Sequence, residues 1–413
     1  MLRTPRLSRS PDLIVSSFDE ADAEVWGALM RRGFGLGEIR IAHFRAGVGD
    51  RWIRIARREG RFAGTGTLIP MTQWFGGRPV PVAGIAAVAV MPDERCRGVA
   101  STILQALMVE ARGLGLAMVV LHAGTLPLYR RAGFARAGVC VDYRLSMAKT
   151  LAPLADPARR VPLRMAPAVG GGSADVRVLN ALRSRLAHRT NGLVERPPLL
   201  WANLLTPAGI EPPTLHLILG EDGAAAGYLL LHPALREEGT LHIVDACLPT
   251  ADTVAQALSF LAGESGKAAM VTWPGGPDDA LAHLAPETEV DIDDWDTWLA
   301  RVLDAPAALM ARGYPRGLTA RLELALEDAL FPANHGYWRL EVADGVGRIT
   351  AGAAAAPGVP VLTLRAEALA PLLTGHLGPV ALQAMDVLDG SEGALALAAL
   401  LFAGPSPWMA DRF

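Results

Sequence analysis

The first 150 residues alternate between helix-like and strand-like spacings of apolar positions. Apolar residues 99, 103, 107 and 111 form one stripe, which predicts a helix from Val99 to about Arg112. Before it come a helical region at 22–45 and strand-like runs at 52–56, 61–70 and 82–90, and after it come an apolar run at 117–121, a short helix at 126–131 and a strand at 139–147. An unbroken apolar run suits a buried parallel strand, so this order predicts an α/β unit with a mixed sheet.

Two further series of elements follow a Pro/Gly-rich stretch at 153–172. The first repeats a similar order: helices at 176–187, 199–205 and 253–262, and strands at 215–219, 226–231 and 241–248. From Trp295 onward the pattern becomes α+β: helices at 305–311, 366–373 and 393–402, and strands at 320–327, 337–342 and 361–364. We therefore predict the fold class α/β and α+β, in three domains at 1–150, 151–292 and 293–413.

Composition narrows the class of protein. A chain of 413 residues with 51% apolar and 20% charged residues predicts a folded protein with several cores. A net charge of -3 argues against a nucleic-acid partner, because neutralising phosphates requires a basic surface. The three cysteines, at 96, 140 and 247, are widely spaced, which predicts neither a disulfide framework nor a metal site and fits the cytoplasm. The start of the chain lacks the apolar core of a signal peptide, and the longest apolar run, 394–403, is too short to span a membrane.

One segment carries the spacing of an anion site. Arg95-x-x-Gly98-x-Ala100 follows the predicted strand at 82–90 and begins the predicted helix at Val99. The start of a helix offers unpaired N–H groups and a positive dipole end to a phosphate, and glycine lets the backbone approach it closely. Taken alone, so short a pattern is more often an ordinary strand-to-helix turn with solvated arginines.

A second segment supports the first. The buried run ends in Leu121-His122-Ala123, and the short helix that follows bears Tyr129 ahead of Gly133-Phe134. At this point the chain resembles the GCN5-related N-acetyltransferase (GNAT) superfamily, in which R/Q-x-x-G-x-G/A binds the pyrophosphate of acetyl-CoA and a tyrosine in a Y-x-x-x-G-F-like segment faces the thioester sulfur.

The closer resemblance is to the enhanced intracellular survival (Eis) family of aminoglycoside acetyltransferases. It covers essentially the whole chain through Ala87–Val90 with Arg95–Gly98, the Tyr129 segment, 298–302 with 307–309, and a terminal Phe413. It implies two tandem GNAT-like domains, the second without a cofactor site, and a sterol carrier protein-like α+β domain. It also implies a homo-oligomer, a hexamer.

The resemblance assigns roles to individual residues. The backbone of Val88, Ala89 and Val90 is expected to hold the acetyl and pantetheine part of acetyl-CoA. The residues expected at its pyrophosphate are Arg95, Cys96, Arg97, Gly98, Val99, Ala100 and Ser101. Tyr129 is the expected general acid and the α-carboxylate of Phe413 the expected base toward the amine. No metal is implied.

Two positions depart from the family pattern. Ser101 stands where family members often carry a basic residue, which affects one phosphate contact. Gly124–Pro127 replaces the glycine-rich, acidic stretch usual before the tyrosine, which affects the acceptor side of the pocket. The acceptor therefore stays open among aminoglycosides, polyamines and lysine-like amines.

Several residues, and the function itself, have alternative interpretations. His122 could assist proton removal, although a histidine there is more often a packing residue. The acidic residues at 19–24 could attract a cationic amine or serve helix starts, and the aspartates at 291–296 fit a solvated linker better than a calcium loop. A lipid- or small-ligand-binding protein that works through the carrier-like domain is the alternative function.

Overall fold

The chain forms two compact units in the computed structural model, which describes residues 12–147, 151, 165–168, 173–232, 239–284, 290–352 and 357–413. The first unit contains the described residues up to Gly138, together with Thr297–Pro407 and Arg412–Phe413. The second contains the described residues of Val139–Asp296 together with Trp408–Asp411. The predicted domain boundaries at 150/151 and 292/293 stay a prediction, and the first of them lies outside the described residues.

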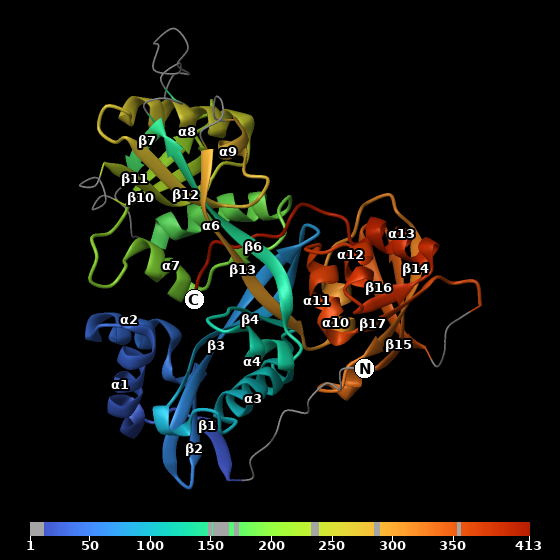
Figure 1. Ribbon diagram of the computed structural model, residues 1–413. Coiled ribbons are helices and arrows are strands. Elements are labelled where there is room, and N and C mark those ends of the chain that lie inside the picture. Colours follow the sequence, from blue (N-terminus) through green and yellow to red (C-terminus); the bar gives the residue numbers. More distant parts are fainter. Residues whose placement is uncertain are drawn as a thin grey trace. The chain divides into compact units, whose positions relative to one another are not determined.

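The first unit begins with a mixed sheet. Its strands are β1 (Leu13–Ser17), β2 (Ile53–Arg58), β3 (Arg61–Phe75), β4 (Arg78–Val90), β5 (Met118–His122) and the end of β13 (Val290–Val302). Neighbours are antiparallel except β4 and β5, which run parallel. The helical segments are η1 (Glu20–Asp22), α1 (Ala23–Phe34), α2 (Glu38–Val48), η2 (Asp50–Trp52), η3 (Pro92–Glu94), α3 (Val99–Gly113) and α4 (Leu126–Arg131). Helices α1 and α2 lie on one side of the β3–β4 hairpin and α3 on the other (Figure 1).

The β3–β4 hairpin is longer than the sequence predicted. The predicted strands stopped at 70 and began again at 82; Pro70, Pro79 and Pro81 lie in or beside the stretch left out, and prolines are uncommon inside paired strands. The hairpin instead continues to a turn at Gly76-Gly77. Both glycines have positive φ, at 60° and 75°, as this tight turn requires. Pro79 and Pro81 lie two residues apart, so their missing N–H groups belong to the same side of the strand and the alternate residues keep the other side of the ladder.

The second unit repeats a mixed sheet in the order β6, β12, β11, β10, β9, β7. The strands of this sheet are β6 (Ala135–Ser146, from Val139 onward), β7 (Met165–Ala168), β9 (Thr214–Leu219), β10 (Ala225–His232), β11 (Thr240–Cys247) and β12 (Met270–Gly275). The short strand β8 (Val194–Glu195) is not part of this order. Its helices are α6 (Ser173–Ala187), α7 (Pro198–Leu205), α8 (Ala251–Glu264) and α9 (Ala280–Leu284). The predicted repetition of the first fold is confirmed here.

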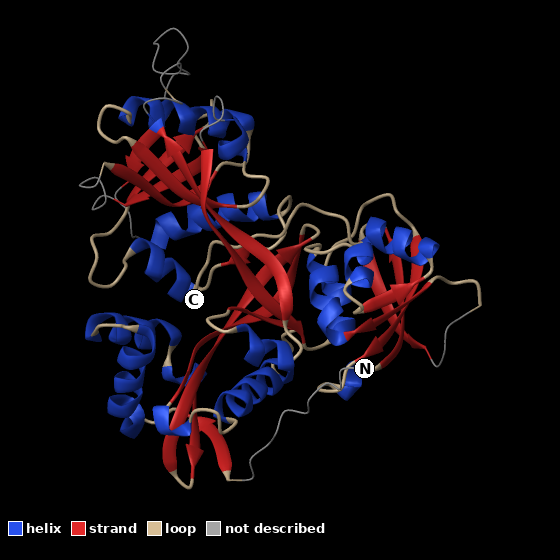
Figure 2. Cartoon of the chain, in the orientation of Figure 1, coloured by secondary structure: helices blue, strands red, loops and turns tan. Residues whose placement is uncertain are grey.

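The α+β series at the end of the chain forms a five-stranded sheet in the order β16, β15, β14, β17, β18. Its strands are β14 (Ala320–Glu327), β15 (Gly336–Ala343), β16 (Val346–Gly352), β17 (Val361–Arg365) and β18 (Leu388–Gly390). Its helical segments are α10 (Ala305–Ala311), η6 (Pro332–Asn334), α11 (Ala366–Thr374), α12 (Pro379–Ala384) and α13 (Glu392–Leu401). Helices pack against this sheet (Figure 2), as the predicted fold class requires.

One interpretation of the sequence was wrong. The aspartate-rich segment at 291–296 is part of strand β13 and not a linker. Its side chains are largely exposed, and Asp293 pairs with Arg144 of β6 at 3.0 Å. Alternating charge in an exposed strand imitates the composition of a loop, which explains the error.

A buried ion pair connects β13 to the α+β series within the first unit. Arg301 is 1% exposed, and one of its terminal nitrogens donates to both carboxylate oxygens of Asp328, each at 2.7 Å. Its Nε also donates to the carbonyl of Ala132, just after helix α4, at 3.3 Å. Asp328 in turn accepts backbone hydrogen bonds from Leu330 and Phe331 and one from the Asn334 amide.

Removing one charge of this pair should destabilise the first unit. Asp328→Asn leaves the buried Arg301 guanidinium without a counter-ion, which costs on the order of 3–5 kcal/mol in buried pairs. The matched control is Glu341→Gln in the exposed pair Arg321–Glu341, where both side chains are well solvated and the cost should stay below about 1 kcal/mol. Denaturant unfolding of the two variants measures the difference; equal effects would contradict a structural role for the buried pair.

Candidate active site

The site begins where two parallel strands separate. The pairing of β4 with β5 joins Val82–Gly84 to Met118–Val120. Beyond Gly84, β4 continues to Val90, whereas β5 ends at His122. Two parallel strands that stop pairing leave backbone groups that a ligand can use between them.

A β-bulge redirects the last residues of β4. Thr65 of β3 pairs with Ala89 and Thr67 with Ala86, so Ala87 and Val88 together face the single residue between those threonines. Ala87 has φ of 52°, a left-handed conformation that is uncommon for a residue with a side chain. Such local strain persists where the surrounding structure enforces it, and bulges frequently adjoin functional sites.

The redirected residues line a small pocket. It has a volume of about 160 Å³ and is lined by Val88, Ala89 and Val90 of β4, Pro92 and Arg95 of the following loop, and Leu29, Arg32, Gly33 and Phe34 of α1. The structure therefore brings four of the predicted cofactor residues together: Val88, Ala89, Val90 and Arg95. The α1 residues were not among the predicted site residues, because nothing in the spacing of α1 separates pocket residues from core residues.

The loop after β4 leads directly into the start of α3. Gly98 is the N-cap residue and has φ of 81°, and Cys96 has φ of 61°. Since glycine has no side chain that could cap the helix, the first N–H groups, of Val99, Ala100 and Ser101, point toward whatever lies ahead of α3. The resulting partial positive charge favours an anion at this point.

Ion pairs brace the same loop. Glu94 accepts from Arg58 of β2 at 2.8 Å and lies 3.5 Å from Arg97. Arg58 also donates to the Arg97 carbonyl at 3.1 Å. Arg95 and Arg97 are both exposed, so their charges stay available to a ligand in solution.

Helix α4 holds Tyr129 in the core of the first unit. The side chain is 8% exposed, and its ring lies edge-on to Phe134 with centroids 5.7 Å apart. Burial raises the pKa of the Tyr129 phenol, because the phenolate loses hydration. Arg301 packs closely against the end of α4. A Cβ added at Gly133 would come within 2.8 Å of the Arg301 Nε, so the contact leaves no room for a side chain there.

Phe413 lies at the point where β4 and β5 separate. A Cβ built on Gly84 would come within 2.4 Å of the Phe413 ring, so only glycine permits this contact. The ring also lies edge-on to His122, with centroids 6.3 Å apart. Gly84 was not among the predicted site residues; a glycine inside a predicted strand was the signal that could have revealed it.

The remaining candidates have structural partners. Asp19 accepts from the Ala21 amide at 2.9 Å, and Asp22 pairs with Arg57 at 2.6 Å. Glu20 pairs with Arg45. The acidic residues at 19–24 thus serve a helix start and ion pairs, which favours the structural interpretation. Among the described residues, no group of three acidic, histidine or cysteine side chains has the arrangement of a metal site.

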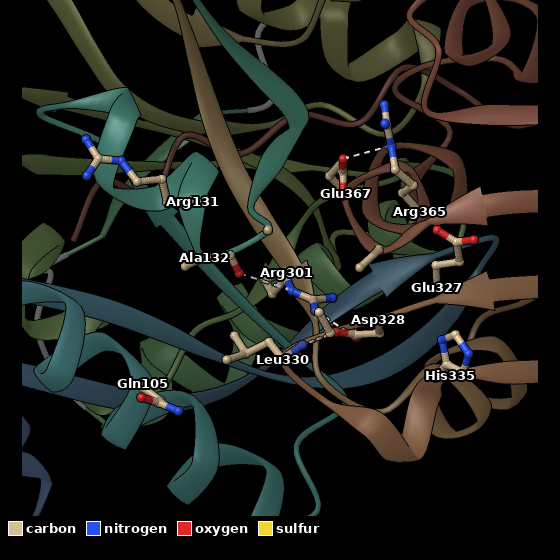
Figure 3. A pocket seen from close by; sticks show the side chains of 13 residues that line it. Gln105, Arg131, Ala132, Arg301, Glu327, Asp328, Leu330, His335, Arg365 and Glu367 are labelled. Atoms are coloured by element: carbon tan, nitrogen blue, oxygen red, sulfur yellow. Dashed lines mark hydrogen bonds and ion pairs between the residues drawn. The ribbon is translucent and has the colours of Figure 1, made fainter. Parts of the chain in front are cut away.

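A second, larger pocket of about 630 Å³ lies elsewhere in the first unit (Figure 3). Its lining is rich in charge and includes the buried pair Arg301–Asp328 and the pair Arg365–Glu367, which is 3.2 Å long. Residues Arg131–Gly133, at the end of the helix that bears Tyr129, form another part of its wall. The sequence did not predict this pocket.

Comparison with known proteins identifies the class. The family descriptions that match are an acetyltransferase (GNAT) domain at 15–137, a second acetyltransferase (GNAT) domain at 192–302 and a sterol carrier protein domain at 305–410. A GCN5-related N-acetyltransferase from Anabaena variabilis is 30% identical in sequence, with a TM-score of 0.89 over 97% of this chain and 100% of that one. A GCN5-related N-acetyltransferase from Kribbella flavida is 27% identical, with a TM-score of 0.84 over 97% and 98% of the two chains.

The chain belongs to the GCN5-related N-acetyltransferase family, and it is an acetyl-transferring enzyme. Within that family it is similar to the N-acetyltransferase Eis of Mycobacterium tuberculosis, with 27% identity over 301 residues, 67% of each chain. Its architecture is two GNAT domains followed by a sterol carrier protein-like domain, as predicted. No helix in the described part of the chain is both long and apolar enough to cross a membrane.

The contact between Gly84 and Phe413 yields a test of the geometry. Gly84→Ala should displace the ring, because the new methyl group would overlap it and overpacking costs about 1–3 kcal/mol, roughly a fivefold or larger shift toward a displaced tail. Carboxypeptidase release of the last residue should accelerate accordingly. Gly113→Ala is the control, since a Cβ there meets nothing within 4 Å; equal release from both variants would exclude a close contact in solution.

Proposed function

We propose that this enzyme transfers the acetyl group of acetyl-CoA to an amine of a cationic small molecule by direct attack. The observation that carries the proposal is the position of Phe413, whose ring lies against Gly84, where the strand leading to the anion-binding loop separates from its neighbour. Three features thus follow one another along β4 and the loop after it. The terminal residue contacts Gly84, the bulge lies at Ala87 and Val88, and the start of α3 without a side-chain cap comes at Gly98.

GNAT acetyltransferases use acetyl-CoA, and the residues present suit it. The backbone of Val88, Ala89 and Val90 would hold the acetyl and pantetheine part, because the bulge frees this end of β4 for hydrogen bonding. The pyrophosphate would lie at the start of α3, within reach of Arg95, Cys96, Arg97, Gly98, Val99, Ala100 and Ser101. Ser101 contributes a neutral hydroxyl and an N–H group, so the arginines supply all the side-chain charge of the loop.

Tyr129 and Phe413 would manage the protons. As the amine nitrogen bonds to the acetyl carbon and the carbon–sulfur bond breaks, the sulfur needs a proton and the nitrogen must lose one. Tyr129 remains a neutral O–H donor at physiological pH because burial raises its pKa. An ammonium has no free electron pair, so the acceptor would first lose a proton to solvent and attack as the neutral amine. The α-carboxylate of Phe413, ionised at neutral pH, would orient that amine by accepting a hydrogen bond, and the proton that the nitrogen loses on acylation would pass through this carboxylate or a water to solvent; as a direct base toward an amine the carboxylate is weak.

The acceptor is proposed as an amine, of an aminoglycoside, a polyamine or a lysine-like compound. The names of the relatives specify N-acetyl transfer and support no finer choice. The protein is further proposed to act in the cytoplasm as a homo-oligomer, a hexamer, with no nucleic-acid or membrane partner and no metal. The second GNAT domain is proposed to bind no CoA, because its sequence lacks a glycine-containing anion loop between strand and helix.

The alternative, lipid binding through the sterol carrier protein-like domain, gains no support from the second pocket. That pocket is bordered by the domain's Glu327, Asp328, Arg365 and Glu367, all of them charged. Burying a lipid chain against charged side chains gives little hydrophobic gain. The amine-transfer proposal therefore explains more of the structure.

Cofactor binding should depend on Gly98. Gly98→Val forces a branched side chain into a left-handed conformation at the start of α3 and blocks close approach by a phosphate. We expect acetyl-CoA at a hundred times the wild-type Kd to stabilise the wild type by about 2.7 kcal/mol and the variant by almost nothing. Titration of the wild type should saturate at one CoA per chain.

Gly60→Val provides the matched control for this change. Gly60 has φ of 80°, so its substitution carries the same backbone strain in the hairpin turn between β2 and β3, where a Cβ meets nothing within 4 Å. It should lose stability and keep the thermal shift caused by acetyl-CoA. A full shift with Gly98→Val, or a stoichiometry of two, would contradict the proposed cofactor site.

Turnover should depend on Tyr129 and on the terminal residue. In an assay that follows free thiol released from acetyl-CoA with a panel of amines, Tyr129→Phe should lower kcat about a hundredfold, a typical contribution of a general acid, and leave CoA affinity unchanged. Because burial raises the phenol's pKa, the ratio of wild-type to variant rates should stay constant up to about pH 10.

Deleting Phe413, or extending the chain beyond it, should likewise lower kcat with little effect on CoA affinity. Full activity of an extended chain would remove the carboxylate from the mechanism and make His122 the next candidate. Acetylation of alcohols alone, or of no amine in the panel, would overturn the proposed acceptor class.

A further inference from the structure

The second unit contains a buried cluster of charges at the start of the terminal tail. Arg183, Arg196, Asp245 and Asp411 are each 2–7% exposed. Arg196 donates to both oxygens of Asp245, at 2.6 and 2.9 Å, and through Nε to Asp411 at 2.5 Å. Arg183 completes the cluster at 3.3 Å from Asp245 and 3.6 Å from Asp411. Two guanidinium groups therefore balance two carboxylates.

The charges are fixed from several sides. Tyr228, fully buried, donates its hydroxyl to Asp245 at 2.6 Å, and the Arg196 guanidinium lies 4.9 Å from the centre of the Trp201 ring. Burial opposes ionisation of Asp245, but the two arginines outweigh it and lower its pKa to about 2. Asp245 is thus negative at neutral pH and holds both guanidinium groups in place.

The residues just before Asp411 are bound as closely. The Trp408 amide donates to the Asn191 carbonyl and the Met409 amide to the Val139 carbonyl, each at 3.0 Å. A Cβ at Gly192 would lie 2.6 Å from the Trp408 carbonyl oxygen, and a Cβ at Gly276 would lie 2.4 Å from the Trp408 indole. Two glycines thus leave room for the tail, and Met409 is completely buried.

We propose that this cluster anchors the tail and that Arg183 and Arg196 are positioning residues for Phe413. Only Arg412 separates Asp411 from Phe413, so the two Cα atoms can be at most about 7 Å apart. Fixing Asp411 therefore limits where the terminal residue can be. The second GNAT domain, proposed to bind no cofactor, gains a function in this way. The catalytic part of this inference rests on the proposed role of Phe413.

The chemistry of the cluster suits positioning better than stabilisation. Buried ion pairs often add little to stability compared with apolar residues of the same size, because both partners lose their hydration. Losing one partner is costly, however, since a charge is then buried without a counter-ion. An ion cluster that includes a tail residue consequently enforces one position of that tail and penalises every other.

Asp411→Asn tests the anchor in the full-length chain. The change keeps the shape of the side chain and leaves two guanidinium groups with one carboxylate. Hydrogen exchange at residues 408–413, followed by mass spectrometry, should accelerate about tenfold or more, kcat for amine acetylation should fall by a similar factor, and the Kd for CoA should not change. Asp293→Asn, in the exposed pair with Arg144 of the same unit, is the control and should change none of the three.

Two further variants separate positioning from stability. Arg183→Gln combined with Asp411→Asn restores a neutral cluster, so it should recover most of the lost unfolding midpoint while kcat stays low. Gly276→Ala displaces Trp408 without altering any charge and should repeat the faster exchange and the lower kcat, even if Asp411→Asn fails to fold.

The outcomes distinguish this inference from the proposed mechanism. Unchanged exchange of the tail in both Asp411→Asn and Gly276→Ala would overturn the anchor. Faster exchange with wild-type kcat would overturn the positioning role. If deletion of Phe413 leaves kcat intact while exchange still responds to Asp411→Asn, the anchor stands and the proposed role of the terminal carboxylate fails.

Discussion

The candidate active site depends on the point at which β4 stops pairing with β5. Up to Gly84 the two strands share a ladder, and beyond it β4 bulges at Ala87 and continues into the loop before α3. The Phe413 ring lies at this separation, and the bulge and the start of α3 follow it along the chain. The strained φ of Ala87 is a local cost that repositions Val88–Val90, and the rest of the sheet, closely paired on both sides, holds it in place.

Two buried arginines hold the end of helix α4 and the start of the terminal tail in place. Arg301 joins the end of the Tyr129 helix to Asp328, and Arg196 joins Asp245 to the tail residue Asp411. Both arginines engage carboxylates with several hydrogen bonds, an arrangement that the planar guanidinium permits and that specifies direction as well as distance. The same arrangement thus occurs twice, once at the end of the helix that bears Tyr129 and once at Asp411, two residues before Phe413.

Local signals in the sequence predicted a large part of the fold. Helices 126–131 and 305–311 were predicted to the residue, because periodicity and the glycine or proline signals agree there. The predicted anion loop is a loop ahead of α3 with a left-handed Gly98. Strand β13 was missed because its exposed aspartates imitate a linker, and the far end of the β3–β4 hairpin because its prolines imitate a break.

Long-range contacts set the remainder, and no local pattern reveals them. Gly84 is a site residue only because the Phe413 ring arrives beside it, and the 4 charged members of the tail cluster come from positions 183, 196, 245 and 411. Their hydropathy predicts exposed side chains, yet all are buried since each finds an opposite charge. The catalytic role expected of Phe413 came from family resemblance and not from composition.

A crystal structure of the protein with CoA and an amine acceptor tests the central claim most directly. We expect pyrophosphate oxygens within hydrogen-bond distance of the N–H groups of residues 97–101, the thiol near Tyr129, and the acceptor nitrogen near the Phe413 carboxylate. A pyrophosphate bound away from the start of α3, or an acceptor remote from Phe413, would contradict it.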